Sequence, residues 1–142
     1  MSDVRLKGLW MSNTPWCTSG YGIQTNYLMP RFRERGYVFD IFAFYGLQGG
    51  MLKWNGFTMY PLARDPYGND IVEAHYAHAQ AQLLITLLDV WVLHDFPKKV
   101  KRWVPYMPVD HDPVQRIVLE HINGAWDVLP YAKFGQEQLA KA

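Results

Sequence analysis

The order of apolar and polar residues along the first part of the chain predicts a strand, a loop, a helix and a second strand. Residues 4–11 alternate partly and then become apolar, as a sheet strand does, and the turn formers of 12–20 end this run. Apolar side chains recur at helical spacing over 21–35, and Gly36 stands where a helix C-cap belongs. Residues 38–44 are rich in β-branched and aromatic side chains, so this region predicts a βαβ unit with two parallel strands.

The middle of the chain predicts a hairpin, a helix and a buried strand. An Asn-Gly pair at 55–56 between two apolar runs is the strongest short-range hairpin signal. Asp70 and Glu73 form a capping-box pattern at the start of a helix predicted over 71–82. The apolar run 83–88 predicts a strand that is covered on both faces of the sheet.

The last part of the chain continues the alternation of strands and helices. Residues 102–107 predict a short strand, in which Pro105 indicates an edge or irregular position. Asp112 followed by Pro113 is typical of a helix N-cap and first helical residue, and Gly124 would end that helix. Two further elements complete the pattern, a strand over 126–131 and a helix over 135–142.

This order of elements predicts an α/β protein: a Rossmann-like, three-layer α/β/α domain with a mostly parallel sheet and a small β-hairpin excursion. A length of 142 residues, 49% of them hydrophobic, fits a single domain over residues 1–142. A second domain of normal size has no room in this length.

Charge and cysteine content narrow the function classes. Fourteen Lys and Arg against thirteen Asp and Glu give a formal charge of +1, which argues against nucleic acid as the main partner. Cys17 is the single cysteine, which excludes an internal disulfide framework and fits a reducing compartment. The most apolar run, 83–93, is too short to span a bilayer, so we expect a soluble, cytoplasmic protein.

Ligands of open α/β sheets bind outside the carboxyl ends of the strands, so the segments that follow predicted strands are the candidates for a site. These segments are unusually polar or rich in glycine. They cover residues 12–22, 45–50, 89–95, 110–112 and 131–135.

The glycine-rich segment Thr-Ser-Gly-Tyr-Gly at 18–22 stands directly before a predicted helix. Its free amides and the helix dipole favour an anion such as a phosphate, although glycines that only make a turn would give the same pattern. Gly20 and Gly22 begin a dinucleotide fingerprint, but Thr25 occupies the place of the third glycine. Asp40 lies at the distance of a ribose-binding carboxylate but inside a strand, so a nicotinamide site is the weaker interpretation.

Carboxylates and aromatic residues follow two later strands. Asp110 and Asp112 flank His111, an arrangement that suits hydrogen bonds to sugar hydroxyls or tuning of the imidazole pKa. The compatible alternative is that Asp112 caps the next helix while Asp110 closes a turn. Asp89 directly follows the buried strand and could reach into the cleft, and Trp91 could stack on a sugar or belong to the core.

Metal-dependent and covalent catalysis are not predicted. His75 and His78 could share a helix face, but no third ligand is suggested, and two surface histidines are the commoner explanation. Cys17 lies near a helix start, yet the sequence indicates no base partner that would make it a nucleophile.

Five motifs in order resemble the N-terminal half of retaining glycosyltransferases of the GT-B fold, the group usually called family 4. The resemblance covers nearly the whole chain. It rests on residues 18–22, 35–38, 86–91, 103–111 and 131–139. Two positions depart from the family pattern. Leu88 stands where many relatives have a histidine, so a catalytic histidine is not carried over, and Ala132 replaces a common serine.

The resemblance implies that the complete enzyme transfers a hexose from a nucleotide diphosphate sugar to an acceptor with retention of configuration, without a metal or a bound cofactor. It implies that this domain receives the acceptor, and that the donor-binding C-terminal domain is absent from the 142 residues, which should therefore be inactive alone. The glycine-rich segment would lie on the donor diphosphate side, through Ser19, Gly20, Tyr21 and Gly22. Asp89, Asp110 and His111 are the candidates for acceptor positioning and catalysis.

Two other functions remain open at this point. The domain could be a non-catalytic binding or assembly module that pairs with another chain or with itself through the exposed cleft face. A nucleotide-dependent oxidoreductase is the weaker alternative. Binding of a nucleotide sugar, of NAD or of neither distinguishes the three functions.

Overall fold

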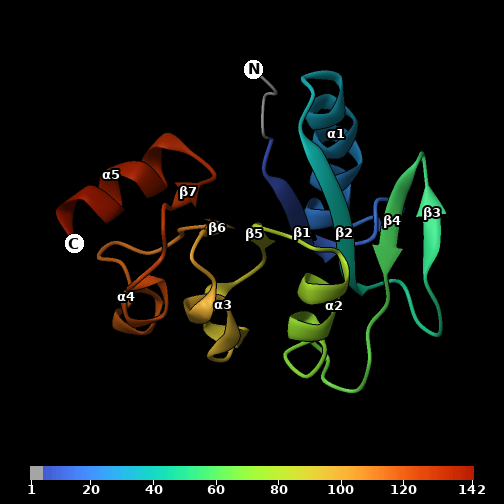
Figure 1. Cartoon of the computed structure of the whole chain (residues 1–142). Coiled ribbons are helices and arrows are strands. Elements are labelled where there is room, and N and C mark those ends of the chain that lie inside the picture. The colour runs from blue at the N-terminus through green and yellow to red at the C-terminus, as the bar shows by residue number, and fades with distance from the viewer. Residues whose placement is uncertain (1–4) are drawn as a thin grey trace.

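The computed structural model describes residues 5–142, which form seven strands and five α-helices (Figure 1). The strands are β1 (Lys7–Asn13), β2 (Val38–Tyr45), β3 (Leu52–Trp54), β4 (Phe57–Tyr60), β5 (Leu83–Leu87), β6 (Trp103–Met107) and β7 (Leu129–Pro130). The helices are α1 (Gly20–Glu34), α2 (Val72–His78), α3 (Phe96–Lys99), α4 (Arg116–Ile122) and α5 (Lys133–Lys141), with a 3₁₀ turn η1 (Val90–Val92). The strand predicted from residue 4 begins at Lys7 within this part, and residue 4 itself lies outside the described residues.

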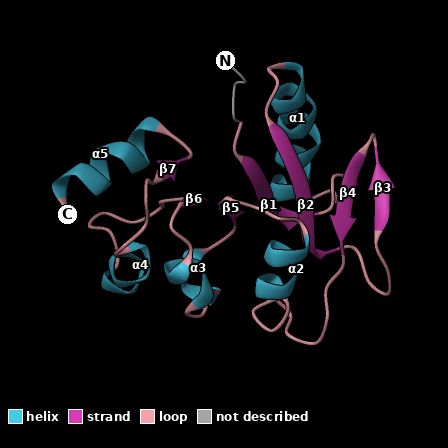
Figure 2. Ribbon diagram, in the orientation of Figure 1, coloured by secondary structure: helices cyan, strands magenta, loops and turns pink. Residues whose placement is uncertain are grey.

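All seven strands belong to one sheet with the order β3-β4-β2-β1-β5-β6-β7. Every pair of neighbours is parallel except β3 and β4, whose opposite directions are visible in Figure 2. If the six parallel strands are counted along the chain, their order across the sheet is 3-2-1-4-5-6, the Rossmann order. The predicted α/β class, the mostly parallel sheet and the hairpin are therefore confirmed.

Helices cover both faces of the sheet. Leu28 and Phe32 of α1 pack on one face, around the buried Trp10. Helices α2 to α5 supply the apolar side chains on the opposite face, which include Val72 and Phe96. This arrangement gives the three predicted layers, and it leaves the carboxyl ends of β1, β2 and β5 at one edge of the sheet.

Two buried tryptophans find polar partners inside this core. The indole nitrogen of Trp10 donates to the Thr25 hydroxyl at 3.1 Å, which joins β1 to α1. The indole nitrogen of Trp103 donates to the Thr86 hydroxyl at 3.1 Å, which joins β6 to β5. Each threonine meets an N–H group that would otherwise be buried without an acceptor. Thr25, which breaks the dinucleotide fingerprint, is therefore a core residue.

The predicted capping box of α2 is wrong. Ile71 occupies the N-cap position without a side-chain hydrogen bond, and the helix ends at His78 instead of continuing to residue 82. The Asp70 carboxylate accepts instead from the backbone N–H groups of Arg64 at 3.0 Å and Asp65 at 3.2 Å. The carboxylate that was expected to cap the helix therefore stabilises the turn before it.

Two predictions for the last part of the chain also need correction. Helix α4 begins at Arg116 with Gln115 in the N-cap position, so Asp112 does not cap it. Strand β6 is not an edge strand, because it lies between β5 and β7. However, β7 pairs only with Tyr106 and Met107, and Pro105 pairs on the β5 side alone. The proline therefore removes no hydrogen bond to β7.

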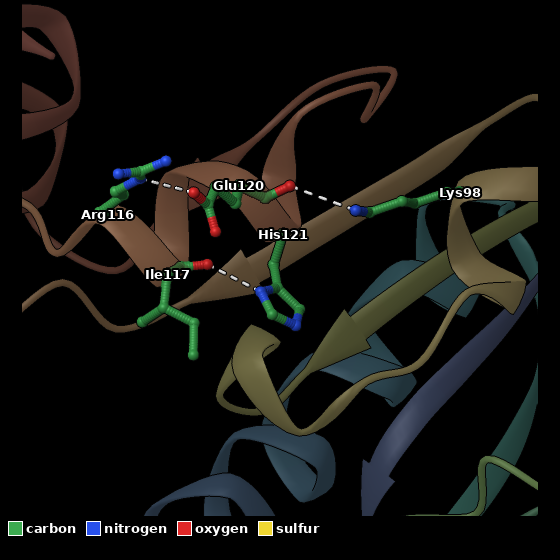
Figure 3. A network of polar contacts seen from close by, with 5 residues as sticks. All are labelled: Lys98, Arg116, Ile117, Glu120 and His121. Carbon is green, nitrogen blue, oxygen red and sulfur yellow. Dashed lines mark hydrogen bonds and ion pairs between the residues drawn. The ribbon is translucent and has the colours of Figure 1, made fainter.

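Helix α4 has no fully buried residue, but its Val118 and Ile122 pack partly buried against the core. Polar contacts lie along its exposed side (Figure 3). Lys98 of α3 donates to the main-chain carbonyl of Glu120 at 3.2 Å, a cation placed near a helix C-terminus. Arg116 and Glu120 form an ion pair of 2.6 Å one turn apart on the helix surface. The imidazole of His121 contacts the carbonyl of Ile117 at 2.7 Å. Over residues 5–142, no helix is long and apolar enough to cross a membrane.

Candidate functional site

A pocket of about 430 Å³ opens at the carboxyl edge of the sheet, where β1 lies between β2 and β5. The connection after β1 leads to β2 on one side, and the later connection through α2 leads to β5 on the other side. The α/β folds bind their ligands at such switch points. We call this hollow the edge pocket. The side chains that give it its chemistry are Asn13, Tyr21, Tyr45, Tyr67, Asp89 and Trp91. Three of the five predicted segments therefore line one pocket, namely 12–22, 45–50 and 89–95.

The start of α1 forms one wall of the edge pocket, and its polar groups are largely used within the protein. The Ser19 hydroxyl accepts from the Gly22 N–H at 3.1 Å and from the Asn13 side-chain amide at 2.7 Å. A Cβ at Gly22 would lie 2.4 Å from the Cys17 carbonyl oxygen, whereas a Cβ at Gly20 would meet nothing within 4 Å. Gly22 is thus required by packing of the preceding loop, and only Gly20 is open to an approaching ligand.

Free backbone donors remain in the first turn of α1. The N–H groups of Gly20 and Tyr21 belong to the helix start, where no intrahelical acceptor exists. The helix has fifteen residues, and its dipole favours negative charge at this end. Of the predicted anion-binding segment, these two amides are the groups that fit the prediction, while Ser19 and Gly22 act as cap and packing residue.

Tyr21 and Asp89 face one another across the edge pocket. Burial raises the pKa of the Tyr21 hydroxyl to about 12, assisted by the negative charges of Asp89 and Asp110. Burial also raises the pKa of the Asp89 carboxyl, the charge of Asp110 adds to this, and a hydrogen bond from Tyr21 partly opposes it. The phenol stays protonated at neutral pH and acts as a donor, and Asp89 becomes a more basic carboxylate than an exposed one.

Three aromatic side chains present accessible rings around this carboxylate. Tyr45 is 63% exposed, Trp91 is 51% exposed and Tyr67 is 40% exposed. Large aromatic side chains usually bury their area, so three accessible rings at one pocket offer surface to a ligand. Trp91 is therefore a pocket residue, and the alternative that placed it in the core is wrong.

Asp110 and His111 lie apart from the pocket lining. His111 contacts the Asp110 carboxylate at 2.5 Å, and both side chains are largely exposed. Beside them is a separate hollow of only about 20 Å³, which has room for about one water molecule. The structure thus brings Asp110 into electrostatic range of Asp89 and Tyr21, and it does not bring His111 into the edge pocket.

A buried hydroxyl group lies behind Tyr21. The Tyr131 hydroxyl is buried and finds no hydrogen-bond partner among residues 5–142. Its ring contacts those of Tyr21, at 6.5 Å between centroids, and Tyr106, at 4.8 Å. Burial raises its pKa, so it stays protonated. The predicted segment 131–135 thus approaches the site through the aromatic contact of Tyr131 with Tyr21 and does not line the edge pocket.

Tyr67 was missed by the sequence reasoning, although a signal for it exists. The segment 65–69, Asp-Pro-Tyr-Gly-Asn, follows β4 and is rich in turn formers like the five segments that were considered. Asp65 holds this turn by accepting from the N–H groups of Tyr67 at 2.9 Å and Asn69 at 3.1 Å. Burial alone would raise the pKa of Asp65, but these hydrogen bonds outweigh it and the pKa is lowered.

The histidines of α2 have structural roles. His75 is half-buried. Its imidazole Nε2 donates to the Pro61 carbonyl at 2.8 Å, and its ring packs against Phe42 and Tyr60 with centroids at 4.9 Å. His78 contacts the Tyr60 hydroxyl at 3.1 Å. The explanation of two surface histidines is therefore wrong for His75. No group of three or more potential metal ligands occurs in the described part of the chain.

Asp40, the residue that the oxidoreductase alternative needs to bind a ribose, is not available for this role. Asp40 is buried in the middle of β2, and its carboxylate forms an ion pair with Lys7 at 2.8 Å. Lys7 begins β1, so the pair lies toward the edge of the sheet opposite to the edge pocket. A ribose held at the carboxyl ends of the strands would not meet this carboxylate.

Comparison of the chain with known proteins finds no relative. No family model matches the chain, no curated protein matches it, and no solved structure matches it. Its function is therefore inferred from the residues and geometry of the edge pocket and from the sequence motifs.

Proposed function

We propose that the chain is the acceptor-binding, Rossmann-like domain of a retaining GT-B glycosyltransferase, and that the edge pocket receives the acceptor sugar. One observation carries the proposal: a basic carboxylate, Asp89, lies among three accessible aromatic rings at the switch point of a Rossmann-ordered sheet. Sugars have hydroxyl groups that donate to carboxylates and C–H faces that pack on aromatic rings. The order of the sequence motifs supports the same function.

The polar groups of the pocket suit an uncharged ligand rich in hydroxyls. Asp89 would accept from a sugar hydroxyl, and hydrogen bonds to an ionised acceptor are the stronger ones. Tyr21 would orient Asp89 through its hydrogen bond, and its hydroxyl oxygen would accept from a second sugar hydroxyl. Trp91 and Tyr45 would cover the apolar faces of the sugar ring. A mostly apolar lining with a few placed polar groups is typical of small-molecule sites.

Asp89 is the candidate for catalysis in this domain. A carboxylate whose pKa is raised is better matched to accept a proton from the acceptor hydroxyl as that oxygen attacks the donor sugar. Asp110 would act through Asp89, since its charge contributes to the raised pKa. His111 would have no direct part, because it lies outside the pocket lining.

The donor diphosphate would meet this domain at the start of α1. The amides of Gly20 and Tyr21 and the helix dipole would stabilise the negative leaving group electrostatically. None of the described residues that line the edge pocket is a lysine or an arginine. The cationic contacts to the diphosphate would therefore come from the second domain that the family resemblance implies.

Ligand titrations of the full chain test this proposal. Trp91 stands in the pocket wall, so we expect millimolar binding of a neutral saccharide to change the tryptophan fluorescence. Asp89→Asn should weaken binding at least tenfold, and Trp91→Phe should remove most of the spectral change. Asp95→Asn is the matched control, because Asp95 is exposed and does not line the pocket. NAD binding, or silence toward every neutral saccharide of a broad panel, would contradict the proposal.

The accessible rings also favour a second candidate, an assembly module that associates through the same face. Tyr45, Tyr67 and Trp91 together form an exposed aromatic surface of the kind that marks interaction sites. Sedimentation velocity distinguishes the two functions. A dimer that Trp91→Ala dissociates would favour the assembly module, and a monomer that binds saccharides would favour the acceptor domain.

A further inference from the structure

We infer that the acceptor is an elongated, neutral oligosaccharide, because a second hollow that would hold further sugar units adjoins the edge pocket at Phe44 and Tyr45. This inference rests on the proposed function and names its substrate class. The second hollow, here called the outer pocket, has a volume of about 600 Å³. It is lined by Phe44, Tyr45, Gly46, Gln48, Leu62 and Pro66.

The two pockets share one wall and have sequence neighbours on the other side. Phe44 and Tyr45, at the end of β2, line the edge pocket and the outer pocket alike. On the other side, one turn contributes Tyr67 to the edge pocket and its neighbour Pro66 to the outer pocket. The rings of Phe44 and Tyr67 lie 6.3 Å apart between centroids, so the two sides are in contact beneath the shared Tyr45 boundary. We call the two adjoining pockets together the groove.

Backbone hydrogen bonding fixes the position of Tyr45, which lines both pockets. The Tyr45 carbonyl accepts from the Thr14 N–H at 2.9 Å, beyond a register shift between Ser12 and Asn13 of β1. Gly46 follows with φ of +92°, and a Cβ there would lie 2.3 Å from the Thr14 hydroxyl oxygen. Only glycine suits this position, and the local bulge directs the Tyr45 side chain outward between the pockets.

The far end of the groove is fixed as well. Gln48 forms a parallel β-bridge with Leu62, and the Leu62 N–H donates to the Leu47 carbonyl at 3.1 Å. Leu47 is buried, which anchors this loop to the sheet. The exposed Gln48 side chain therefore stands on a held backbone and offers both a donor and an acceptor to a ligand. A preformed groove loses little entropy when it binds.

The charge of the side chains that line the groove distinguishes between neutral and charged extended ligands. Asp89 is the single charged residue among the described residues that line the two pockets. Nucleic acids and acidic polymers need cations, which this lining lacks. A peptide that binds by adding a strand to a sheet edge finds no edge here, because β2 is already paired on both sides. The aromatic rings, the Gln48 amide and the single carboxylate of the two linings suit neutral sugar units.

Calorimetric titration with linear gluco- and manno-oligosaccharides of one to four units tests this inference. We expect the affinity of the full chain to rise at least tenfold from one to three units of the series that binds. Gln48→Ala should remove most of that gain and leave the monosaccharide affinity within twofold, because Gln48 lines the outer pocket alone. Gln136→Ala, an exposed glutamine of α5, is the matched control and should keep the gain.

The outcomes separate the inference from the proposed function. Monosaccharide binding without any dependence on chain length would overturn the elongated acceptor and leave the acceptor domain intact. A full gain in Gln48→Ala would overturn it as well, as would a neutral hexapeptide that competes as strongly as the tetrasaccharide. Failure of every saccharide to bind would overturn the proposed function itself.

Discussion

The side-chain amide of Asn69 donates to the main-chain carbonyl of Val92 at 3.0 Å and thereby joins two turns that border the edge pocket. Its oxygen accepts from the His94 N–H at 2.8 Å, and its nitrogen also contacts the Asp65 carboxylate at 3.1 Å. One turn carries Tyr67, and the other follows Asp89. One asparagine thus holds the aromatic wall and the carboxylate of the site in a fixed relation before a ligand arrives.

Replacing this asparagine should loosen both turns. Asn69→Ala removes three side-chain hydrogen bonds in a partly buried position, so we expect the free energy of unfolding to fall by about 2 kcal/mol. Saccharide affinity should fall as well, because the pocket walls lose their common support. Urea unfolding measures the first effect, and calorimetry measures the second. Asn26→Ala, an exposed site on α1, should change stability by less than about 0.5 kcal/mol, and an equal loss there would contradict the bridging role.

Asp89 should lower the stability of the protein at neutral pH. Its pKa is raised by burial and by Asp110, so the folded state keeps the proton to a higher pH than the unfolded state does. Stability therefore falls as the pH rises from about 4, the usual carboxyl pKa, through the raised pKa of the folded state. We expect Asp89→Asn to be more stable than the wild type at pH 7, while its saccharide affinity falls at least tenfold.

Urea unfolding of the wild type and Asp89→Asn between pH 3 and pH 8 checks this prediction. The stability difference should shrink toward acid pH and vanish below about pH 4, where both chains are neutral at this position. Asp110→Asn should give a smaller gain at pH 7, since it removes only the second cause of the shift. If the wild type is more stable than Asp89→Asn at pH 7, the folded state stabilises the charged Asp89 carboxylate, and the prediction is wrong.

The two glycines of the α1 start should respond in opposite ways to alanine. A Cβ at Gly22 meets the Cys17 carbonyl oxygen at 2.4 Å and the Thr14 carbonyl oxygen at 2.9 Å, so the backbone must move. We expect Gly22→Ala to cost about 2 kcal/mol of unfolding free energy. Gly20→Ala has free space and a helical position, and it should gain about 0.5 kcal/mol. Thermal unfolding of the pair measures both, and equal effects would contradict the packing role of Gly22.

Removal of the buried Tyr131 hydroxyl should not destabilise the protein. The group has no hydrogen-bond partner among the described residues, so Tyr131→Phe keeps the ring contacts and relieves an unpaired donor. We expect a change between zero and a gain of about 1 kcal/mol. Tyr60→Phe is the matched control, because the Tyr60 hydroxyl contacts His78 at 3.1 Å and its loss should cost about 1 kcal/mol. Equal losses in both variants, measured by urea unfolding, would contradict this prediction.

Local sequence chemistry predicted most elements of the fold. The Asn-Gly pair at 55–56 makes the hairpin between β3 and β4, with φ of +47° at Asn55 and +85° at Gly56, values that few other residue pairs adopt. Asp70 and Asp112 were wrongly predicted as helix caps for the opposite reason. An aspartate can accept from any nearby N–H group, and for Asp70 the three-dimensional course of residues 64–65 supplied nearer donors.

The candidate site was predicted in part. Asp89, Tyr21 and Tyr45 lie in segments that follow strands, and the rule for α/β sheets places them at one edge. His111 also follows a strand, β6, and yet it does not line the pocket. Its imidazole contacts the neighbouring Asp110 carboxylate instead. Tyr67 lies on a turn after β4, and its approach to Phe44 depends on how that turn folds back over the sheet.

The sequence by itself determined the order of the strands and of every helix except the short α3, the parallel pairing of β1 and β2, and the segments that carry polar groups. These depend on spacing and turn chemistry within a few residues. The tertiary structure alone decided that Trp91 is exposed, that Gly22 serves packing while Gly20 is open, and that Asn69 ties two turns together. These properties depend on contacts between residues far apart along the chain, and such contacts have no local signature.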